Sequence, residues 1–228
     1  MIKAIIFDMG GVLVDLDIED CKEAFKRDLG YYEIDQIIDA CHQKGIYGDL
    51  EEGKLSADDF RKLVLAGSRE GAMPEDVDKA MYHILVGIAP YKVDMLRRLS
   101  ESYDLYMLSN NNPICLPCAQ KMFAEAGIPL DKIFKKCYMS FEMKALKPSE
   151  AFYKSVIQDI GLTSEQLLFV DDSHRNVDGA IDAGLPAVYY EPGTDLDELI
   201  RRILADDAAC DGMESEGSDG YINMEGGC

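Results

Sequence analysis

Short apolar runs that alternate with helical patterns constrain the fold of this chain more than any other feature of its sequence. There are four such runs, and β-branched residues occur in three of them: residues 2–7, 104–108, 167–170 and 187–190, with none in 104–108. Helical periodicity separates them, over residues 92–100, 112–126, 148–160 and 175–183. Strands that alternate with helices pair in parallel through right-handed crossovers. The pattern therefore predicts an α/β fold with a doubly wound parallel sheet, whose central strand is the continuously apolar run at residues 2–7.

One long segment interrupts this alternation. It contains helical patterns and no convincing strand, over residues 17–29, 31–44, 56–67 and 74–86. Ser56 is expected to cap the third helix, because Asp59 follows three residues later as in a capping box. We therefore expect a core made of residues 1–15 and 90–204, with a small all-helical domain over residues 16–89 inserted after the first strand.

The charge balance excludes two classes of partner. The chain has 43 Asp and Glu against 23 Lys and Arg, a net charge of −20. Nucleic acids and anionic membranes are bound through basic surface, so neither is expected as a partner. Seven of the acidic residues follow Arg202, where no Lys or Arg occurs. Residues 205–228 are therefore expected to form a flexible acidic tail.

The sequence also predicts a cytoplasmic location. No apolar run approaches the length of about 18 residues that a membrane span needs. The apolar N-terminus carries a single Lys and is interrupted by Asp8, which is typical of a buried strand rather than a signal peptide. The seven cysteines are odd in number and scattered, as expected of reduced thiols.

Polar residues that can bind metal or phosphate follow the predicted strands. They lie directly after a strand or just before a helix: Asp8, Ser109, Asn110, Lys147, Asp171 and Asp172. Ligands of open α/β sheets bind outside the carboxyl ends of the strands. We therefore expect these side chains to converge on one site.

These residue types suit phosphoryl transfer. A carboxylate at a strand end, such as Asp8, can attack phosphorus or carbon as a nucleophile. Further carboxylates would repel it unless a divalent cation joined them, and oxygen-only ligands suit Mg²⁺. Ser109 and Lys147 could then hold the remaining phosphoryl oxygens.

Four motifs, in this order, resemble those of the haloacid dehalogenase superfamily of hydrolases. They are FDMGGVLVD at 7–15, LSN at 108–110, KP at 147–148 and FVDDSHRNVDGA at 169–180. The resemblance covers the chain to about residue 200, and the helical insertion lies where this superfamily carries a cap. It implies a Rossmann-like core, a covalent aspartyl intermediate and Mg²⁺ as the cofactor.

The resemblance also implies a role for each site residue. Asp8, Ser109 and Lys147 would be catalytic, with Asp8 as the nucleophile. Phosphate would be bound by Ser109, Asn110 and Lys147. The metal would be held by Asp8, the backbone carbonyl of Gly10, Asp171 and Asp172, with Asp172 as a direct ligand and Asp171 beside it or acting through water.

Gly10 departs from the motif of this superfamily. Its phosphatases usually have a second Asp at this position, which protonates the leaving group and later activates water. Loss of a general acid–base typically costs about 10²–10⁴-fold in rate. The DxG variant recurs in a branch that includes sugar-1-phosphate phosphatases. It favours anomeric sugar phosphates, aryl phosphates or pyrophosphate, whose leaving groups need little protonation, unless a cap acid such as Asp49, Glu51 or Glu52 substitutes.

These observations favour a Mg²⁺-dependent phosphatase that acts on a small phosphorylated metabolite, with a sugar phosphate as the first expectation. Two alternatives stay open. A 2-haloacid dehalogenase needs neither Mg²⁺ nor the second Asp, but such enzymes generally lack a carboxylate pair like Asp171 and Asp172. A non-catalytic phosphometabolite-binding protein is compatible with Gly10. The oligomeric state is not predicted.

Overall fold

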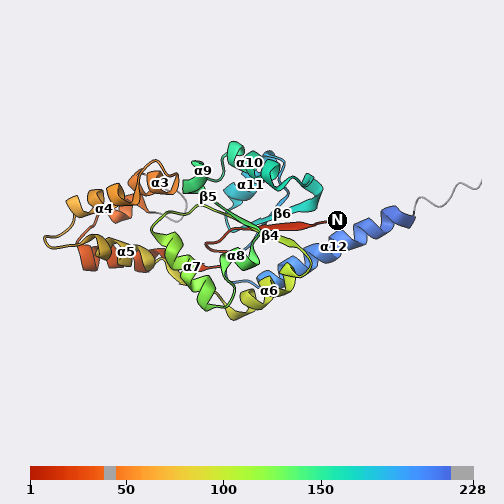
Figure 1. Ribbon diagram of the computed structural model, residues 1–228, viewed down its shortest axis with the longest axis horizontal. Helices are drawn as coiled ribbons and strands as arrows, with labels where there is room; N and C mark the ends of the chain where they lie inside the picture. The colour runs from red at the N-terminus through yellow and green to blue at the C-terminus, as the bar shows by residue number, and fades with distance from the viewer. Residues whose placement is uncertain (39–44, 217–228) are drawn as a thin grey trace, which may run out of the picture.

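The computed structural model of the protein describes residues 1–38 and 45–216, with side chains described as far as residue 209. Its centre is a parallel five-stranded sheet of order β5-β4-β1-β6-β7 (Figure 1). The strands are β1 (Ala4–Phe7), β4 (Asp104–Ser109), β5 (Lys136–Met139), β6 (Leu167–Asp171) and β7 (Ala187–Tyr189). The predicted α/β class and its doubly wound parallel sheet are confirmed.

Strand β1 lies at the centre of the sheet, as its unbroken apolar sequence predicts. All four of its residues are fully buried. Its last residue, Phe7, pairs with Met107 of β4 on one side and with Val170 of β6 on the other. This register brings the carboxyl ends of the three strands level with one another, which is where the predicted site residues lie.

Helices cover both faces of the sheet (Figure 1). On one face lie α6 (Pro90–Ser100), α7 (Cys115–Glu125), α8 (Leu130–Ile133) and α12 (Leu196–Glu216), which pack with Ile5 and Phe7. On the other lie α10 (Glu150–Ile160) and α11 (His174–Asp182), which pack with Ala4 and Ile6. The short α9 (Ser140–Met143) follows β5, and the 3₁₀ turn η2 (Ser164–Gln166) precedes β6. Successive residues of a strand face opposite sides, so β1 supplies both cores.

The insertion between β1 and α6 has a hydrophobic core of its own. Its helical elements are α1 (Ile18–Ala24), the π-helical η1 (Phe25–Leu29), α2 (Ile34–Ile37), α3 (Gly45–Glu51), α4 (Ala57–Ala66) and α5 (Pro74–Tyr82). Ser56 caps α4 as expected, since its Oγ accepts a hydrogen bond from the Asp59 amide at 3.1 Å. Ile114 and Cys115, which follow β4 in the sheet domain, also pack into this cluster.

Two strands at the base of the insertion were not predicted. Strand β2 (Asp15–Leu16) pairs antiparallel with β3 (Leu85–Gly87), so the expectation of no strand between residues 16 and 89 is wrong. These strands are too short to show an alternating pattern, and their pairing depends on residues far apart in the chain. The helix expected over 31–44 is observed only as α2, and residues 39–44 of it lie outside the described residues.

The C-terminal helix is longer than expected. Helix α12 continues to Glu216, so the expected start of a flexible tail at residue 205 is wrong for the described part. Its apolar stripe at Leu196, Leu199, Ile200 and Ile203 packs on the core of the sheet and explains where the helix begins. The remainder of the expected tail, residues 217–228, lies outside the described residues. Within the described ranges, no helix has the length and apolar character that crossing a membrane requires.

Phe169 of β6 lies in the hydrophobic core between the sheet and α10. Its substitution tests how much this packing stabilises the fold. Its ring is fully buried and its centroid lies 5.9 Å from that of Tyr153 in α10. We expect Phe169→Ala to lower the free energy of unfolding by about 3–5 kcal/mol, measured by urea denaturation. Tyr32→Ala is the control, because that ring is 70% exposed and its loss should change stability by less than about 0.5 kcal/mol. Equal effects of the two substitutions would contradict this account of the core.

Candidate active site

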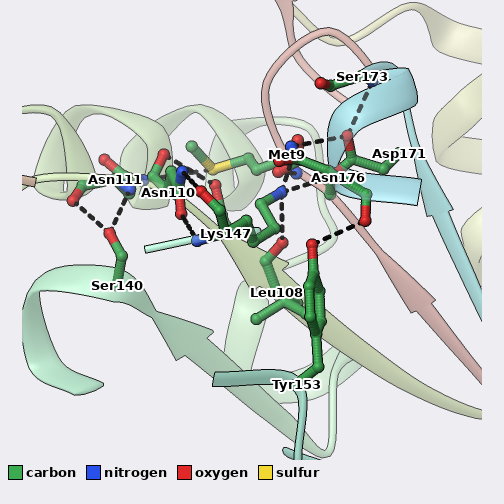
Figure 2. A network of polar contacts seen from close by, with 12 residues as sticks. Met9, Leu108, Asn110, Asn111, Ser140, Lys147, Tyr153, Asp171, Ser173 and Asn176 are labelled. Carbon is green, nitrogen blue, oxygen red and sulfur yellow. Dashed lines mark hydrogen bonds and ion pairs between the residues drawn. The ribbon is translucent and has the colours of Figure 1, made fainter. Parts of the chain in front are cut away.

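The candidate site lies at the carboxyl ends of β1, β4 and β6 (Figure 2). Asp8 follows β1 directly, while Ser109 and Asp171 are the last residues of β4 and β6. All three side chains are buried, as is Lys147, which lies between α9 and α10. The predicted convergence of these groups from separate parts of the chain is therefore seen in the structure.

The Lys147 ammonium group joins the buried carboxylates. Its Nζ lies 2.9 Å from Oδ2 of Asp8 and 2.7 Å from Oδ2 of Asp171, and it donates a hydrogen bond to the carbonyl of Leu108 at 3.1 Å. Burial opposes a charge on this group, but the two carboxylates outweigh burial and raise the pKa of Lys147. Lys147 is thus a fixed cation beside the predicted nucleophile.

Asn110 holds Lys147 in place through its side-chain amide. Its Oδ1 accepts a hydrogen bond from the Lys147 backbone amide at 2.8 Å, and its Nδ2 donates to the Lys147 carbonyl at 3.2 Å. The sequence predicts phosphate binding by Asn110, whereas in the structure its side chain is engaged with the backbone of Lys147. Ser109 differs, because within the described residues its hydroxyl makes only a long 3.3 Å hydrogen bond, to the Asn110 carbonyl.

Three carboxylates meet beside Lys147. Asp8, Asp171 and Asp172 each offer an oxygen, and these oxygens lie within 4.8 Å of one another. Burial raises the pKa of Asp172 to about 6, with the neighbouring Asp171 charge adding to the effect. Burial also raises the pKa of Asp8, and the Lys147 charge only partly offsets it. The trio is therefore short of positive charge, and a divalent cation with oxygen ligands fits it.

The hydrogen bonds of Asp171 fix its orientation in the carboxylate trio. Its Oδ1 accepts hydrogen bonds from the Ser173 amide at 2.9 Å and from Asn176 Nδ2 at 3.0 Å, and its Oδ2 is paired with Lys147 (Figure 2). Both oxygens of Asp171 are thus engaged by the protein. The same holds for Asp8, whose Oδ1 accepts a hydrogen bond from the Met9 amide at 2.6 Å and whose Oδ2 is paired with Lys147. Asn176 was not singled out from the sequence, although it lies one turn inside the helix that follows the acidic pair.

The loop after Asp8 contains two glycines, and only the second of them, Gly11, is required by the local geometry. Gly11 has φ +75°, and a Cβ there would lie 1.9 Å from Oδ2 of Asp172. Gly10 lies in the same turn, but a Cβ there would meet only the end of the Leu16 side chain, at 2.8 Å from its Cδ1. The first position accordingly tolerates a side chain at the cost of a shift of Leu16, whereas Gly11 allows the loop and the acidic pair to approach closely.

The fold and this site define a hydrolase of the haloacid dehalogenase type. The model of the haloacid dehalogenase-like hydrolase family matches residues 2–184, and the chain belongs to this family. A D-ribitol-5-phosphate phosphatase of Bacteroides thetaiotaomicron is 37% identical to it over 207 residues, which are 90% of this chain and 99% of the relative.

Solved structures agree with this assignment. A haloacid dehalogenase family enzyme of B. thetaiotaomicron, crystallised with magnesium and inorganic phosphate, has a TM-score of 0.81 and 32% identity, over 87% of this chain and 99% of that chain. A hydrolase of the same type from Porphyromonas gingivalis has a TM-score of 0.81 and 33% identity, over 90% and 98%. L-2-haloacid dehalogenase of Xanthobacter autotrophicus, at 24% identity and TM-score 0.58 over 90% and 83%, shares the fold.

The close approach of Gly11 to Asp172 gives a first prediction for the site. Gly11→Ala should lower stability by about 1–3 kcal/mol through backbone strain and should also weaken Mg²⁺ binding, because Asp172 must move. Gly10→Ala is the matched control, since Leu16 is 39% exposed and its side chain can shift. Urea denaturation and calorimetric Mg²⁺ titration measure the two effects. Similar losses in both variants would contradict the role given to Gly11.

The raised carboxylate pKa values predict how metal binding depends on pH. Without metal, the folded protein holds protons on these groups that the unfolded chain releases, so its stability falls as the pH rises through their pKa values. Mg²⁺ needs the deprotonated groups and offsets their repulsion. We therefore expect Mg²⁺ to raise the melting temperature, measured by circular dichroism against EDTA, by more at about pH 8 than at about pH 6. Equal shifts at the two pH values would be evidence against this site.

Proposed function

We propose that the protein is a Mg²⁺-dependent phosphatase that hydrolyses a phosphate monoester of a small sugar or polyol. The observation that carries the proposal is the Lys147 ammonium group, held between Asp8 and Asp171 at the carboxyl edge of the sheet. It leaves a carboxylate nucleophile next to a fixed cation and beside a carboxylate trio suited to a divalent metal. The magnesium and phosphate in the structure of the B. thetaiotaomicron enzyme support the same chemistry.

Each residue has a defined part in the proposed reaction. Asp8 attacks phosphorus in line with the leaving oxygen and forms an aspartyl phosphate, which water then hydrolyses. Lys147 and the Ser109 hydroxyl hold phosphoryl oxygens, while Asn110 positions Lys147. A metal bound by Asp8, Asp172 and the Gly10 carbonyl, with Asp171 orienting the cluster, would neutralise charge on the phosphoryl group.

We assign the insertion at residues 16–89 to a cap that opens for substrate entry, and residues 1–15 and 90–204 to the catalytic core. Asp8 is 7% exposed and Lys147 is 4% exposed, and this burial supports an insertion that moves to admit a metabolite. The ribbon of β2 and β3 is the connection between the two parts and hence the hinge. Closure of the cap would exclude bulk water from the phosphoryl group.

The proposed substrate class is supported by the D-ribitol-5-phosphate phosphatase relative and by the net charge of the chain. The enzyme named D-ribitol-5-phosphate phosphatase acts on an acyclic polyol phosphate, which supports a phosphorylated sugar or polyol here. Nucleic acids and membranes stay outside the proposal because of the net charge of −20. We place the protein in the cytoplasm, in line with the four free thiols among the described cysteines.

Phosphate release with and without Mg²⁺ tests the proposal. The panel contains sugar and polyol phosphates, nucleotides, pyrophosphate and an aryl phosphate, with Asp8→Asn as the control. We expect Mg²⁺-dependent release from a sugar or polyol phosphate, falling to the level of the enzyme-free blank in Asp8→Asn.

Two other results would each replace the proposal by one of the alternatives. Halide release from 2-chloropropionate that EDTA does not affect would identify a dehalogenase. Mg²⁺-dependent binding of phosphate esters without turnover would identify a binding protein.

A further inference from the structure

Glu51, the last residue of α3, is a buried acid that the site described so far does not use. Its side chain is 4% exposed, and its carboxyl group is hydrogen-bonded to the hydroxyl of Tyr47. Its second oxygen, Oε2, is fully buried and has no hydrogen-bond partner in the described part of the chain. Leaving a buried carboxyl oxygen unpaired is costly, so its presence calls for a functional explanation.

The turn that carries Glu51 is fixed to the catalytic core next to the site. Its backbone carbonyl accepts a hydrogen bond from Ser140 Oγ at 2.6 Å, and Ser140 Oγ also accepts one from the Asn111 amide at 3.0 Å. A second attachment joins Lys144 Nζ to the Gly53 carbonyl at 2.7 Å. Helix α3 accordingly lies against α9, as Figure 1 shows. Because Asn111 comes two residues after Ser109, this attachment places the turn that carries Glu51 beside the loop that follows β4, at the edge of the site.

The electrostatics of Glu51 link it to the predicted nucleophile. Burial, with a smaller contribution from the charge of Asp8, raises the pKa of Glu51 to about 8. The hydrogen bond from Tyr47 and the charge of Lys147 act in the opposite direction without cancelling the effect. At neutral pH the group therefore carries a proton and can release it to a stronger base.

The proposed reaction needs a proton donor, and Gly10 has no side chain that could supply one. It provides no side-chain acid where related phosphatases usually have one, and the sequence offers three acids of the insertion as substitutes: Asp49, Glu51 and Glu52. Asp49 is exposed, and Glu52 is paired with Lys54 at 2.6 Å. Among the three, only Glu51 is buried with an unpaired oxygen.

We propose that Glu51 is the general acid–base of this enzyme, supplied by the cap in place of the acid missing at position 10. As Asp8 bonds to phosphorus and the ester P–O bond breaks, Glu51 gives its proton to the leaving oxygen, which departs as an alcohol. Its carboxylate then accepts a proton from the water that breaks the Asp8–phosphorus bond. The cycle converts ester and water to alcohol and phosphate and returns Glu51 to its protonated form. This inference rests on the proposed phosphatase function.

The proposal has a direct consequence for the range of substrates. With an acid above the leaving oxygen, primary-alcohol phosphates become substrates, and the restriction to activated leaving groups that Gly10 predicts no longer applies. It also requires the closed cap for catalysis, since Glu51 belongs to the insertion while Asp8 belongs to the core.

Glu51→Gln tests the assignment, with Glu52→Gln as the matched control from the same turn. Two esters are compared: ribitol 5-phosphate, whose alkoxide needs a proton to leave, and p-nitrophenyl phosphate, whose phenolate does not. We measure kcat/KM, because it reports phosphoryl transfer and not the later hydrolysis of the intermediate. Glu51→Gln should lower it by about 10²–10⁴-fold for the polyol ester and by less than about 10-fold for the aryl ester. Glu52→Gln should leave both values within about 3-fold of wild type.

Pre-steady-state kinetics test the second half of the cycle. Without the base that activates water, the aspartyl phosphate should accumulate in Glu51→Gln. The aryl ester should then give a burst of nitrophenolate of about one equivalent per active site, followed by a slow steady state. Circular dichroism and the Mg²⁺-dependent shift in melting temperature confirm that the variant is folded and its metal site intact.

The possible failures are distinguishable. Equal losses on both esters, or no loss on the polyol ester, in a folded Glu51→Gln variant would overturn the role of Glu51 while the phosphatase function stands. A wild-type protein that releases no phosphate from either ester would overturn the proposed function and the role of Glu51 with it.

Discussion

The buried ion pairs of Lys147 are the interaction on which the rest of the site depends. The ammonium group lies within 2.9 Å of Asp8 and 2.7 Å of Asp171, and its side chain is 1% exposed. Without this cation, three carboxylates would share a buried space with no compensating charge, and removing one partner of such a pair is strongly destabilising. The hydrogen bond that the Asn110 side chain accepts from the Lys147 amide and the one that Asn176 donates to Asp171 both preserve this geometry. The amide side chains near the site therefore act mainly by fixing the charged ones.

Much of this architecture could be predicted from sequence because it is encoded locally. The unbroken apolar run of β1 identifies a central strand, and polar residues at strand ends identify the site. Strand β5 was missed, because its Lys136 and half-buried Cys137 hide the pattern of an edge strand. The ribbon of β2 and β3 was missed since it joins Asp15 to Gly87 and depends on contacts that no local pattern encodes. The engagement of the Asn110 amide with Lys147 has the same origin: the partners lie 37 residues apart.

The missing acid at Gly10 illustrates how a motif and a structure answer different questions. The motif identifies the position where a proton donor is absent, and it predicts a limited range of leaving groups. The structure shows a buried acid of the insertion near the nucleophile, and the relative named for ribitol 5-phosphate is named for an ester of a primary alcohol. The two observations fit together if the catalytic proton comes from the cap.

The packing of Ile114 and Cys115 into the core of the insertion has a consequence for attempts to redesign this enzyme. Their backbone amides are held by the Asn112 side chain at 3.1 and 2.9 Å, in the loop that begins at Ser109. The loop after β4 therefore belongs to the sheet domain in sequence but contributes Ile114 and Cys115 to the core of the insertion. A chimera that exchanged residues 16–89 alone for those of a relative would place a foreign surface against these residues. A graft that also carries residues 111–115 would preserve the packing between this loop and the insertion.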